Sequence, residues 1–194
     1  MLAAATAIVS AEGAEAVQMK DLAQRAGVSL ATLYRYFPSK DYVLLAVSLA
    51  RYQEAARKVF AEVPQGDSVR VRVTNHLLRE FGAQRRNPRL TASLGQALTD
   101  TRRGYSPMIE TIEHLHLQIL SHVAAAGGAL SDGQYKVLPV VNDIFRAATR
   151  RWLAGVFSVA DAEFQIKTGC ELLEVPDDAV AAELERAAPD TRVR

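Results

Sequence analysis

The chain has 194 residues, of which 49% are hydrophobic and 23% charged, and its 23 Lys and Arg nearly balance its 22 Asp and Glu. Such a chain is long enough to bury a sizeable globular core. The lone cysteine, Cys170, excludes a disulfide framework and a four-cysteine zinc site, so we expect a cytoplasmic protein. No apolar run approaches the roughly 18 residues of a membrane span, and the start MLAAATAIVSAEG lacks the basic flank of a signal peptide.

The charges are distributed unevenly along the chain. Residues 1–50 carry four basic and four acidic side chains, residues 51–103 carry eleven and five, and residues 104–194 carry eight and thirteen. Binding to nucleic acid would therefore depend on a few well-placed cations near the front, because this affinity scales with the number of phosphates neutralised.

Apolar residues recur at intervals of three and four along most of the chain, which predicts an all-α protein of about nine helices. Gly13 and Gly27 close the first two helices and Pro38 follows the third. Pro139 lies inside the eighth helix and should bend it or shorten its first turns. We expect the six longer helices at residues 40–62, 68–86, 88–100, 107–126, 131–157 and 161–175, followed by a tail with one or two weak acidic turns.

Residues 19–36, MKDLAQRAGVSLATLYRY, have the layout of a helix-turn-helix. Gly27 can take a positive φ where the chain reverses, Val28 can fill the space between the helices, and Ser29 can cap the second helix. The residues expected to face inward are Leu22, Ala23, Ala26, Leu33 and Phe37. The side chains that a DNA major groove could meet are Ser29, Leu30, Ala31, Thr32, Tyr34, Arg35 and Tyr36. The alternative is a packed three-helix cluster whose outer side chains only contact solvent.

The segments MLAAATAIVSAEG and VQMKDLAQRAGVSLATLYRYFPSKDYVLLAV resemble the TetR-type transcriptional repressors over the front of the chain. With RRNPRLTASL added, the pattern is similar to the subgroup of cholesterol-catabolism repressors. The resemblance implies a TetR-like fold with a helix-turn-helix head at 1–46, an effector-binding and dimerisation body at 47–176 joined through the long fourth helix, and a tail at 177–194. The family's usual basic arm is absent before Met1, so we expect a natural extension that carries several Lys or Arg.

The resemblance also implies roles for individual residues of the head. Lys20 falls where a second-helix side chain meets phosphate or a base edge, and the phosphate-contact positions are Thr32, Tyr36 and Lys40. The base-reading positions are Leu30, Ala31, Tyr34 and Arg35. Leu30 and Ala31 can contact a thymine methyl, whereas Arg35 can either bind guanine or lie along the backbone.

One short reading helix contacts few base pairs, so two copies are needed for specific binding. The resemblance implies a homodimer formed by the last two long helices. Their apolar stripes, which could instead pack only internally, give these interface candidates: Val137, Val141, Ile144, Ala148, Trp152, Val156, Phe164, Thr168 and Leu172.

The resemblance further implies an effector pocket inside the fourth to eighth helices. The candidate lining residues are Phe60, Leu78, Phe81, Leu94, Leu98, Tyr105, Met108, Ile109, Ile112, Asn142 and Phe145, most of which could equally be plain core. Few charges fall among them, so we expect a small apolar effector with one or two polar handles, such as a steroid or an acyl-CoA. A basic cluster that could meet effector phosphates or simply be solvated comprises Arg85, Arg86, Arg89, Arg102 and Arg103.

Enzyme chemistry is excluded by spacing. His114 and His116 are two apart, so on a helix they point in nearly opposite directions and cannot share a metal. No nucleophile elbow or phosphate-binding glycine loop occurs, so we expect no catalysis, metal or cofactor. The sequence predicts a homodimeric, ligand-responsive repressor that a small apolar effector releases from palindromic operator DNA. The alternative is a small-molecule-binding or scaffold protein without specific DNA binding.

Overall fold

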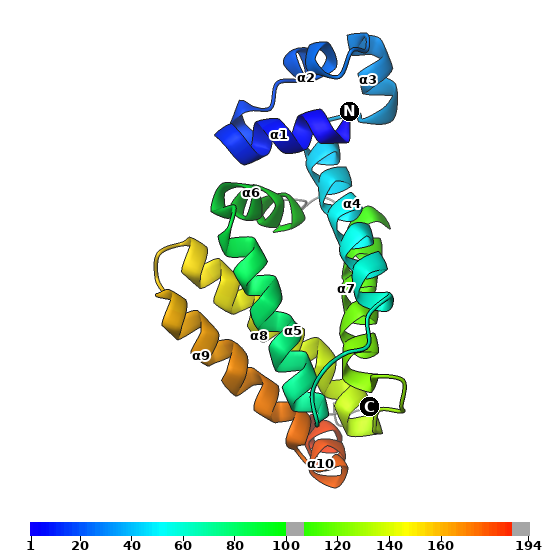
Figure 1. The fold of residues 1–194 in the computed structure, drawn as a ribbon, viewed down its shortest axis with the longest axis vertical. Coiled ribbons are helices and arrows are strands. Elements are labelled where there is room, and N and C mark those ends of the chain that lie inside the picture. The colour runs from blue at the N-terminus through cyan, green and yellow to red at the C-terminus, as the bar shows by residue number, and fades with distance from the viewer. Residues whose placement is uncertain (100–106, 188–194) are drawn as a thin grey trace, which may run out of the picture. The chain divides into compact units, whose positions relative to one another are not determined.

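A computed structural model describes residues 1–99 and 107–187 (Figure 1). All regular structure in these two ranges is helical, with ten α-helices and two short 3-10 turns, which confirms the predicted all-α class. No described helix is long and apolar enough to cross a membrane. The elements are α1 (Leu2–Glu12), η1 (Ala14–Ala16), α2 (Met19–Arg25), α3 (Leu30–Tyr36), α4 (Lys40–Phe60), α5 (Val69–Arg85), α6 (Pro88–Thr99), α7 (Pro107–Ala125), α8 (Asp132–Leu153), α9 (Val159–Cys170), η2 (Glu171–Glu174) and α10 (Asp177–Ala187).

Serine caps start several helices where the sequence predicted a start. The hydroxyls of Ser29, Ser39 and Ser131 each accept a hydrogen bond from the backbone N–H three residues later, at the starts of α3, α4 and α8. Gln134 completes a capping box with Ser131 by accepting from the backbone N–H of that serine. Because these bonds satisfy N–H groups that no helical carbonyl can reach, they fix the beginnings of the helices.

The later helices differ from the prediction in their bounds. Helix α8 ends at Leu153 rather than near residue 157, because the chain reverses at Gly155, which has a φ of 70°. Helix α9 begins at Val159, since Ser158 is its cap and Asp161 is the partner in a capping box rather than the first residue. The predicted weak turns of the tail are the eleven-residue helix α10, which makes ten helices instead of nine.

Helix α8 continues past Pro139 without a break in its assignment. Of the two predicted effects, the first turns are not shortened, since the helix begins at Asp132, seven residues before the proline, and a bend stays a prediction. Proline has no backbone N–H to donate within the helix. The hydrogen bonds of the capping box at Ser131 do not involve that missing group, so they still hold the start of α8.

The chain folds as two compact units, and α5 and α7 contribute residues to both. The predicted functional boundaries after residues 46 and 176 follow a different division and stay a prediction. The first unit comprises Met1–Glu62 and Arg79–Ile119, and the second comprises Val63–Leu78 and Leu120–Arg194.

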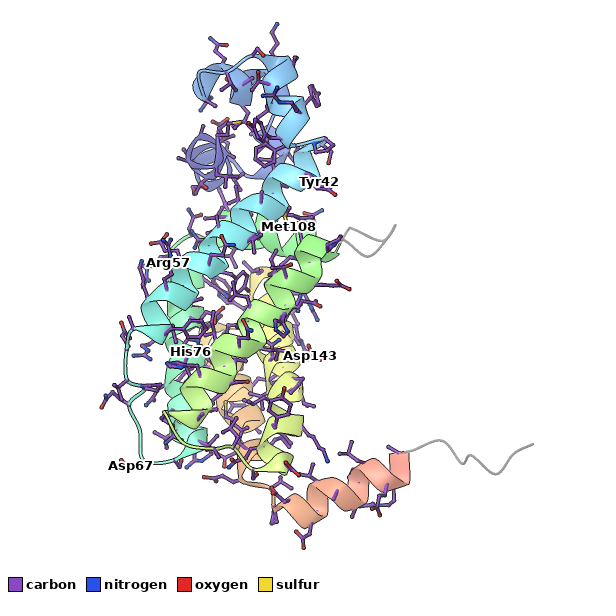
Figure 2. The ribbon with its side chains drawn as sticks, turned by 90° about the vertical axis from the view of Figure 1, so that its right-hand side faces the viewer. Tyr42, Arg57, Asp67, His76, Met108 and Asp143 are labelled. Atoms are coloured by element: carbon purple, nitrogen blue, oxygen red, sulfur yellow. The ribbon has the colours of Figure 1, made fainter. Side chains whose placement is uncertain are left out.

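The first unit is built on a hydrophobic core that the helix-turn-helix shares with α1, α4 and α6. Its members from the front of the chain include the fully covered side chains of Ile8, Leu22 and Leu33. Leu94 of α6 belongs to the same cluster, and Met108 in the first turns of α7 packs against it (Figure 2). The head is therefore continuous with this part of the body through packed side chains.

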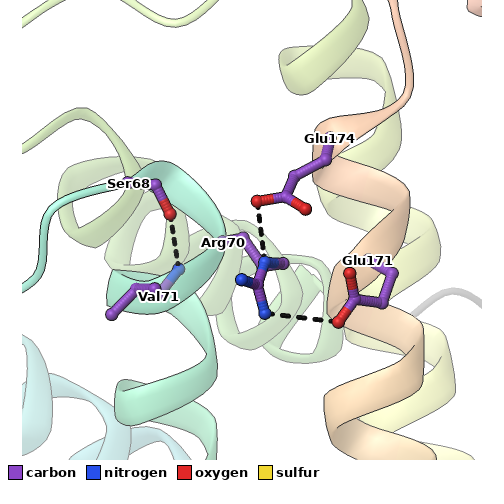
Figure 3. A network of polar contacts seen from close by, with 5 residues as sticks. All are labelled: Ser68, Arg70, Val71, Glu171 and Glu174. Carbon is purple, nitrogen blue, oxygen red and sulfur yellow. Dashed lines mark hydrogen bonds and ion pairs between the residues drawn. The ribbon is translucent and has the colours of Figure 1, made fainter.

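In the second unit, α8 and α9 run side by side (Figure 1). A Cβ atom at Gly169 would lie 2.8 Å from the side chain of Ile144, so a larger residue there would force that side chain to shift. Arg70 of α5 donates to Glu174 at 2.7 Å and to Glu171 at 3.2 Å, which ties the start of α5 to η2 (Figure 3). The hydrogen bond from Arg70 to Glu174, with the negative charge of Glu171, raises the pKa of Arg70 above its ordinary value.

Candidate functional site

The turn between α2 and α3 has the geometry that the sequence predicted. Gly27 has a φ of 66°, and the N–H of Val28 donates to the carbonyl oxygen of Ala23 at 3.0 Å. Leu22 and Leu33 are completely buried beneath the turn. Ala23 is also buried, whereas Ala26 and Phe37 are only partly covered. The two short helices are thus held as one rigid element (Figure 1).

The outward flank of α3 is not covered by any part of the chain that the structure describes. Tyr34 and Tyr36 are 47% and 57% exposed, and Leu30 is 40% exposed. The other exposed residues of the predicted DNA surface are Lys20, Ser29, Ala31 and Arg35, while Thr32 and Lys40 are partly covered. Apolar and aromatic side chains on an exposed helix face are typical of a binding surface. Their individual contacts with DNA stay predictions.

Two local contacts order the side chains of this surface. The hydroxyls of Ser29 and Thr32 lie 2.8 Å apart, and the guanidinium of Arg35 lies 5.4 Å from the ring centroid of Tyr36. A guanidinium over an aromatic face is held by the ring quadrupole. Arg35 is therefore partly ordered before it meets a partner.

Lys40 forms an ion pair that the sequence analysis missed. Its Nζ lies 3.4 Å from Oε2 of Glu15, whose side chain is 90% exposed. The two residues are 25 positions apart, so only the fold brings them together. A phosphate that binds Lys40 must compete with this carboxylate.

Helix α6 holds the end of α1 and the start of η1 through one hydrogen bond each. Arg89 donates to the carbonyl oxygen of Ala11 at 2.7 Å, and the N–H of Ala14 donates to the hydroxyl of Ser93 at 2.9 Å. Arg89 was a candidate for effector phosphates, but its guanidinium makes this contact inside the first unit. Movement of α6 would therefore pull directly on the head.

The predicted interface residues divide into covered and exposed groups in the single chain. Val141 and Ala148 are buried in the second unit. Val156 and Phe164 are 64% and 70% exposed, and Thr168 is also exposed. The four that are partly covered are Val137, Ile144, Trp152 and Leu172. Val140 of α8, which was not predicted, is 48% exposed, and the interface residues themselves stay a prediction.

Five of the ten predicted pocket residues that the structure describes are buried. Leu94 belongs to the shared core of the first unit, against which Leu98, Met108 and Ile109 pack. Phe81 and Ile112 are buried in the first unit, and Asn142 and Phe145 in the second, while Leu78 is partly covered and Phe60 is 44% exposed. Tyr105, Arg102 and Arg103 lie outside the described residues. Whether any of these residues contacts an effector stays a prediction.

A buried polar group lies in the interior of the first unit. Nε2 of His116 is 3.2 Å from Oε2 of Glu80, and the His116 side chain is 4% exposed. Gln84 donates from Nε2 to the other oxygen of Glu80 at 3.1 Å, and the rings of Tyr52 and His116 have centroids 5.2 Å apart. Helices α4, α5 and α7 each contribute to this group.

Sequence analysis considered His116 only as a metal partner of His114. His114 is exposed and lies 3.1 Å from Gln118, so the two histidines face different surroundings. No group of three metal-ligating side chains occurs in residues 1–99 and 107–187. A signal for the polar group was present in the sequence, since His116 follows Ile112 by four positions on an apolar helix face.

Comparison with known proteins gives consistent matches. Residues 1–47 match the family model described as bacterial regulatory proteins, tetR family. The chain is 29% identical over 173 residues to the HTH-type transcriptional repressor KstR of Mycobacterium tuberculosis. These aligned residues cover 89% of this chain and 78% of the relative.

Solved structures match over nearly the same length. A TetR transcriptional regulator from Rhodococcus sp. RHA1 has a TM-score of 0.77 and 28% identity, with 90% of this chain and 95% of that chain covered. The regulator FadR from Bacillus subtilis, solved in complex with stearoyl-CoA, has a TM-score of 0.64 and 16% identity, with 89% and 95% covered. The predicted overall architecture is thereby confirmed.

Proposed function

We propose that the chain is a member of the TetR family of bacterial regulatory proteins, a ligand-responsive repressor that binds a palindromic operator as a homodimer. Family membership makes it a transcriptional regulator rather than an enzyme. The observation that carries the proposal is the rigid helix-turn-helix whose α3 presents an uncovered flank with Tyr34 and Tyr36. Operator DNA as the partner implies a cytoplasmic protein.

In this proposal α3 enters the major groove and its neighbours hold the backbone. Thr32, Tyr36 and Lys40 bind phosphates, because their hydroxyl and ammonium groups can donate to phosphate oxygens and Lys40 sits in the first turn of α4. Lys20 binds a phosphate or a base edge. Bases are read by Leu30, Ala31, Tyr34 and Arg35.

We propose that the dimer forms through the exposed faces of α8 and α9. Phe164 and Val140 are large apolar side chains that the single chain leaves exposed, and a second copy would cover them. Val141 and Ala148 are buried within the single chain, so they contribute to the interface less directly than Phe164 and Val140.

The effector proposed is a small, largely apolar molecule of the steroid or acyl-CoA class. The similarity to FadR solved with stearoyl-CoA supports the acyl thioester. An effector releases DNA only if it binds more tightly to the dimer conformation in which the two helix-turn-helix heads are wrongly spaced for the operator. The bonds of α6 to α1 through Arg89 and to η1 through Ser93 supply a route by which such a preference would reach the head.

The test is a titration of the protein into the intergenic DNA upstream of its own gene at two salt concentrations. We expect sequence preference together with a steep loss of affinity as salt rises. Equal, weak binding to any duplex would favour the alternative, a small-molecule-binding protein without specific DNA binding. Addition of a long-chain acyl-CoA or a steroid to the operator complex then tests release.

A further inference from the structure

Two buried polar atoms in the first unit have no hydrogen-bond partner among the described residues. They are Oγ of Ser48, a residue that is 2% exposed, and Oε1 of Gln84. A buried polar atom without a partner is costly, and native interiors rarely contain one without a reason. A ligand group that is absent from the chain itself is such a reason.

The orientation of the Gln84 amide is fixed by its neighbour. Its Nε2 donates to the carboxylate of Glu80, an acceptor, so the atom left without a partner is the carbonyl oxygen. The other oxygen of Glu80 meets His116, which in turn contacts the ring of Tyr52. Ser48 lies one helical turn before Tyr52, on the same face of α4. Ser48 is therefore on the helix face that is turned toward this polar group.

The helices that carry this polar group also carry buried apolar side chains. Phe81 follows Glu80 in α5 and is completely buried. Ile112 and Ile119 lie one turn on either side of His116 and are each 2% exposed. The surroundings therefore suit an apolar molecule that carries one polar group.

The hydrogen-bonding capacity of the unpartnered atoms selects the chemistry of that group. The Gln84 oxygen can only accept, whereas the Ser48 hydroxyl can donate or accept. A hydroxyl can pair with either atom, because it can donate to the Gln84 oxygen and accept from the Ser48 hydroxyl. A carboxylate cannot donate to Gln84 and would be repelled by the carboxylate of Glu80.

We propose that Ser48 and Gln84, with Glu80 held by His116, form a binding site for an uncharged hydroxyl group on the apolar effector, and that this site rejects a free carboxylate. The inference rests on the proposed function, because it specifies the effector of the proposed repressor. It predicts selection for an alcohol over a carboxylic acid that has the same apolar frame.

The experiment measures binding of three matched probes, 1-decanol, decyl methyl ether and decanoate, to the full chain by calorimetry. We expect 1-decanol to bind about tenfold more tightly than the ether, which cannot donate to Gln84, and decanoate to bind least. Ser48→Ala and Gln84→Leu should each remove most of the advantage of the alcohol. Glu80→Gln should improve binding of decanoate. Gln118→Ala, an exposed change on α7, is the control and should leave all three affinities unchanged.

A second readout does not depend on a ligand. If Ser48 has no partner in the free protein, Ser48→Ala should raise the midpoint of thermal unfolding, because it removes an unsatisfied buried hydroxyl. A lowered midpoint would mean that the hydroxyl has a structural role and would overturn the inference.

Equal affinity for 1-decanol and decyl methyl ether, or no binding of any of the three probes, would also overturn the inference of a hydroxyl-binding site. Operator binding without probe is measured in parallel on the same protein. Intact operator binding together with loss of the alcohol preference would refute this inference alone. Absence of sequence-specific operator binding would refute the proposed function.

Discussion

Replacement of Lys40 by alanine tests how the head contacts the DNA backbone. We expect Lys40→Ala to weaken binding to the operator and to a scrambled duplex by about the same factor, because a phosphate contact carries no sequence information. Tyr36→Ala should behave in the same way. The ion pair of Lys40 with Glu15 makes a second, opposite prediction, since Glu15→Gln releases the ammonium for phosphate and removes a negative charge from the DNA side.

The magnitudes follow from the exposure of the pair. The Lys40 and Glu15 side chains are 33% and 90% exposed, so solvent and salt screen their attraction and its loss should hardly affect folding. A charge-assisted contact to phosphate is worth roughly 1–2 kcal/mol, so we expect Lys40→Ala to weaken binding about fivefold to thirtyfold. It should also reduce the slope of log affinity against log salt by about 0.9. For Glu15→Gln we expect an affinity gain of about twofold to fivefold, because an exposed ion pair is worth up to about 1 kcal/mol.

The assay is fluorescence anisotropy with both duplexes at several salt concentrations. Lys58 is the matched control, because it lies on the same helix and is paired with Glu54 at 2.7 Å. Lys58→Ala should change neither the affinity nor the salt slope. In the double variant, Glu15→Gln should lose most of its benefit, since Lys40 is no longer present. Unchanged affinity in Lys40→Ala, or weaker binding in Glu15→Gln, would refute the assignment of Lys40 to phosphate.

Three further changes probe separate parts of the account. Phe164→Glu should convert the dimer to monomers in analytical ultracentrifugation, because it places a charge in an apolar contact, and a persistent dimer would place the interface elsewhere. Hydrogen bonds from Ser158 lower the pKa of Asp161 below its ordinary value. These bonds therefore stabilise the folded protein above the ordinary carboxyl pKa, and this stabilisation is lost as the pH falls through the lowered pKa of Asp161. Ser158→Ala should therefore destabilise the protein to denaturant at about pH 7, with a smaller difference near pH 3, and an equal difference at both would contradict this. Ala31→Met should change the preferred operator sequence in a selection from random duplexes while non-specific affinity stays the same, and an unchanged preference would remove Ala31 from the reading surface.

The sequence predicted the fold well where local chemistry decides the structure. Ser131 with Gln134 forms the expected capping box, and Gly27 takes the positive φ that the turn requires. Prediction failed where two local signals competed. The apolar residues Val156 and Phe157 appeared to continue α8, but the chain reverses at Gly155 and leaves Val156 exposed.

The candidate sites were less predictable. The helical spacing of apolar residues predicts that a side chain is buried, but it does not predict whether a ligand or the protein core buries it. Leu94 has the spacing of a pocket residue, yet it is part of the core that joins α6 to the head. Glu15 and Glu80 gave no signal, since their partners Lys40 and His116 are 25 and 36 positions away. Contacts of this kind appear only when the helices are packed.

Hydrogen exchange of the backbone amides with and without operator DNA tests the central claim most directly. We predict slower exchange across residues 29–40, which cover α3 and the start of α4, when the operator is bound and much weaker slowing with a scrambled duplex. Exchange in this segment that the operator leaves unchanged, with slowing confined to other helices, would contradict the account.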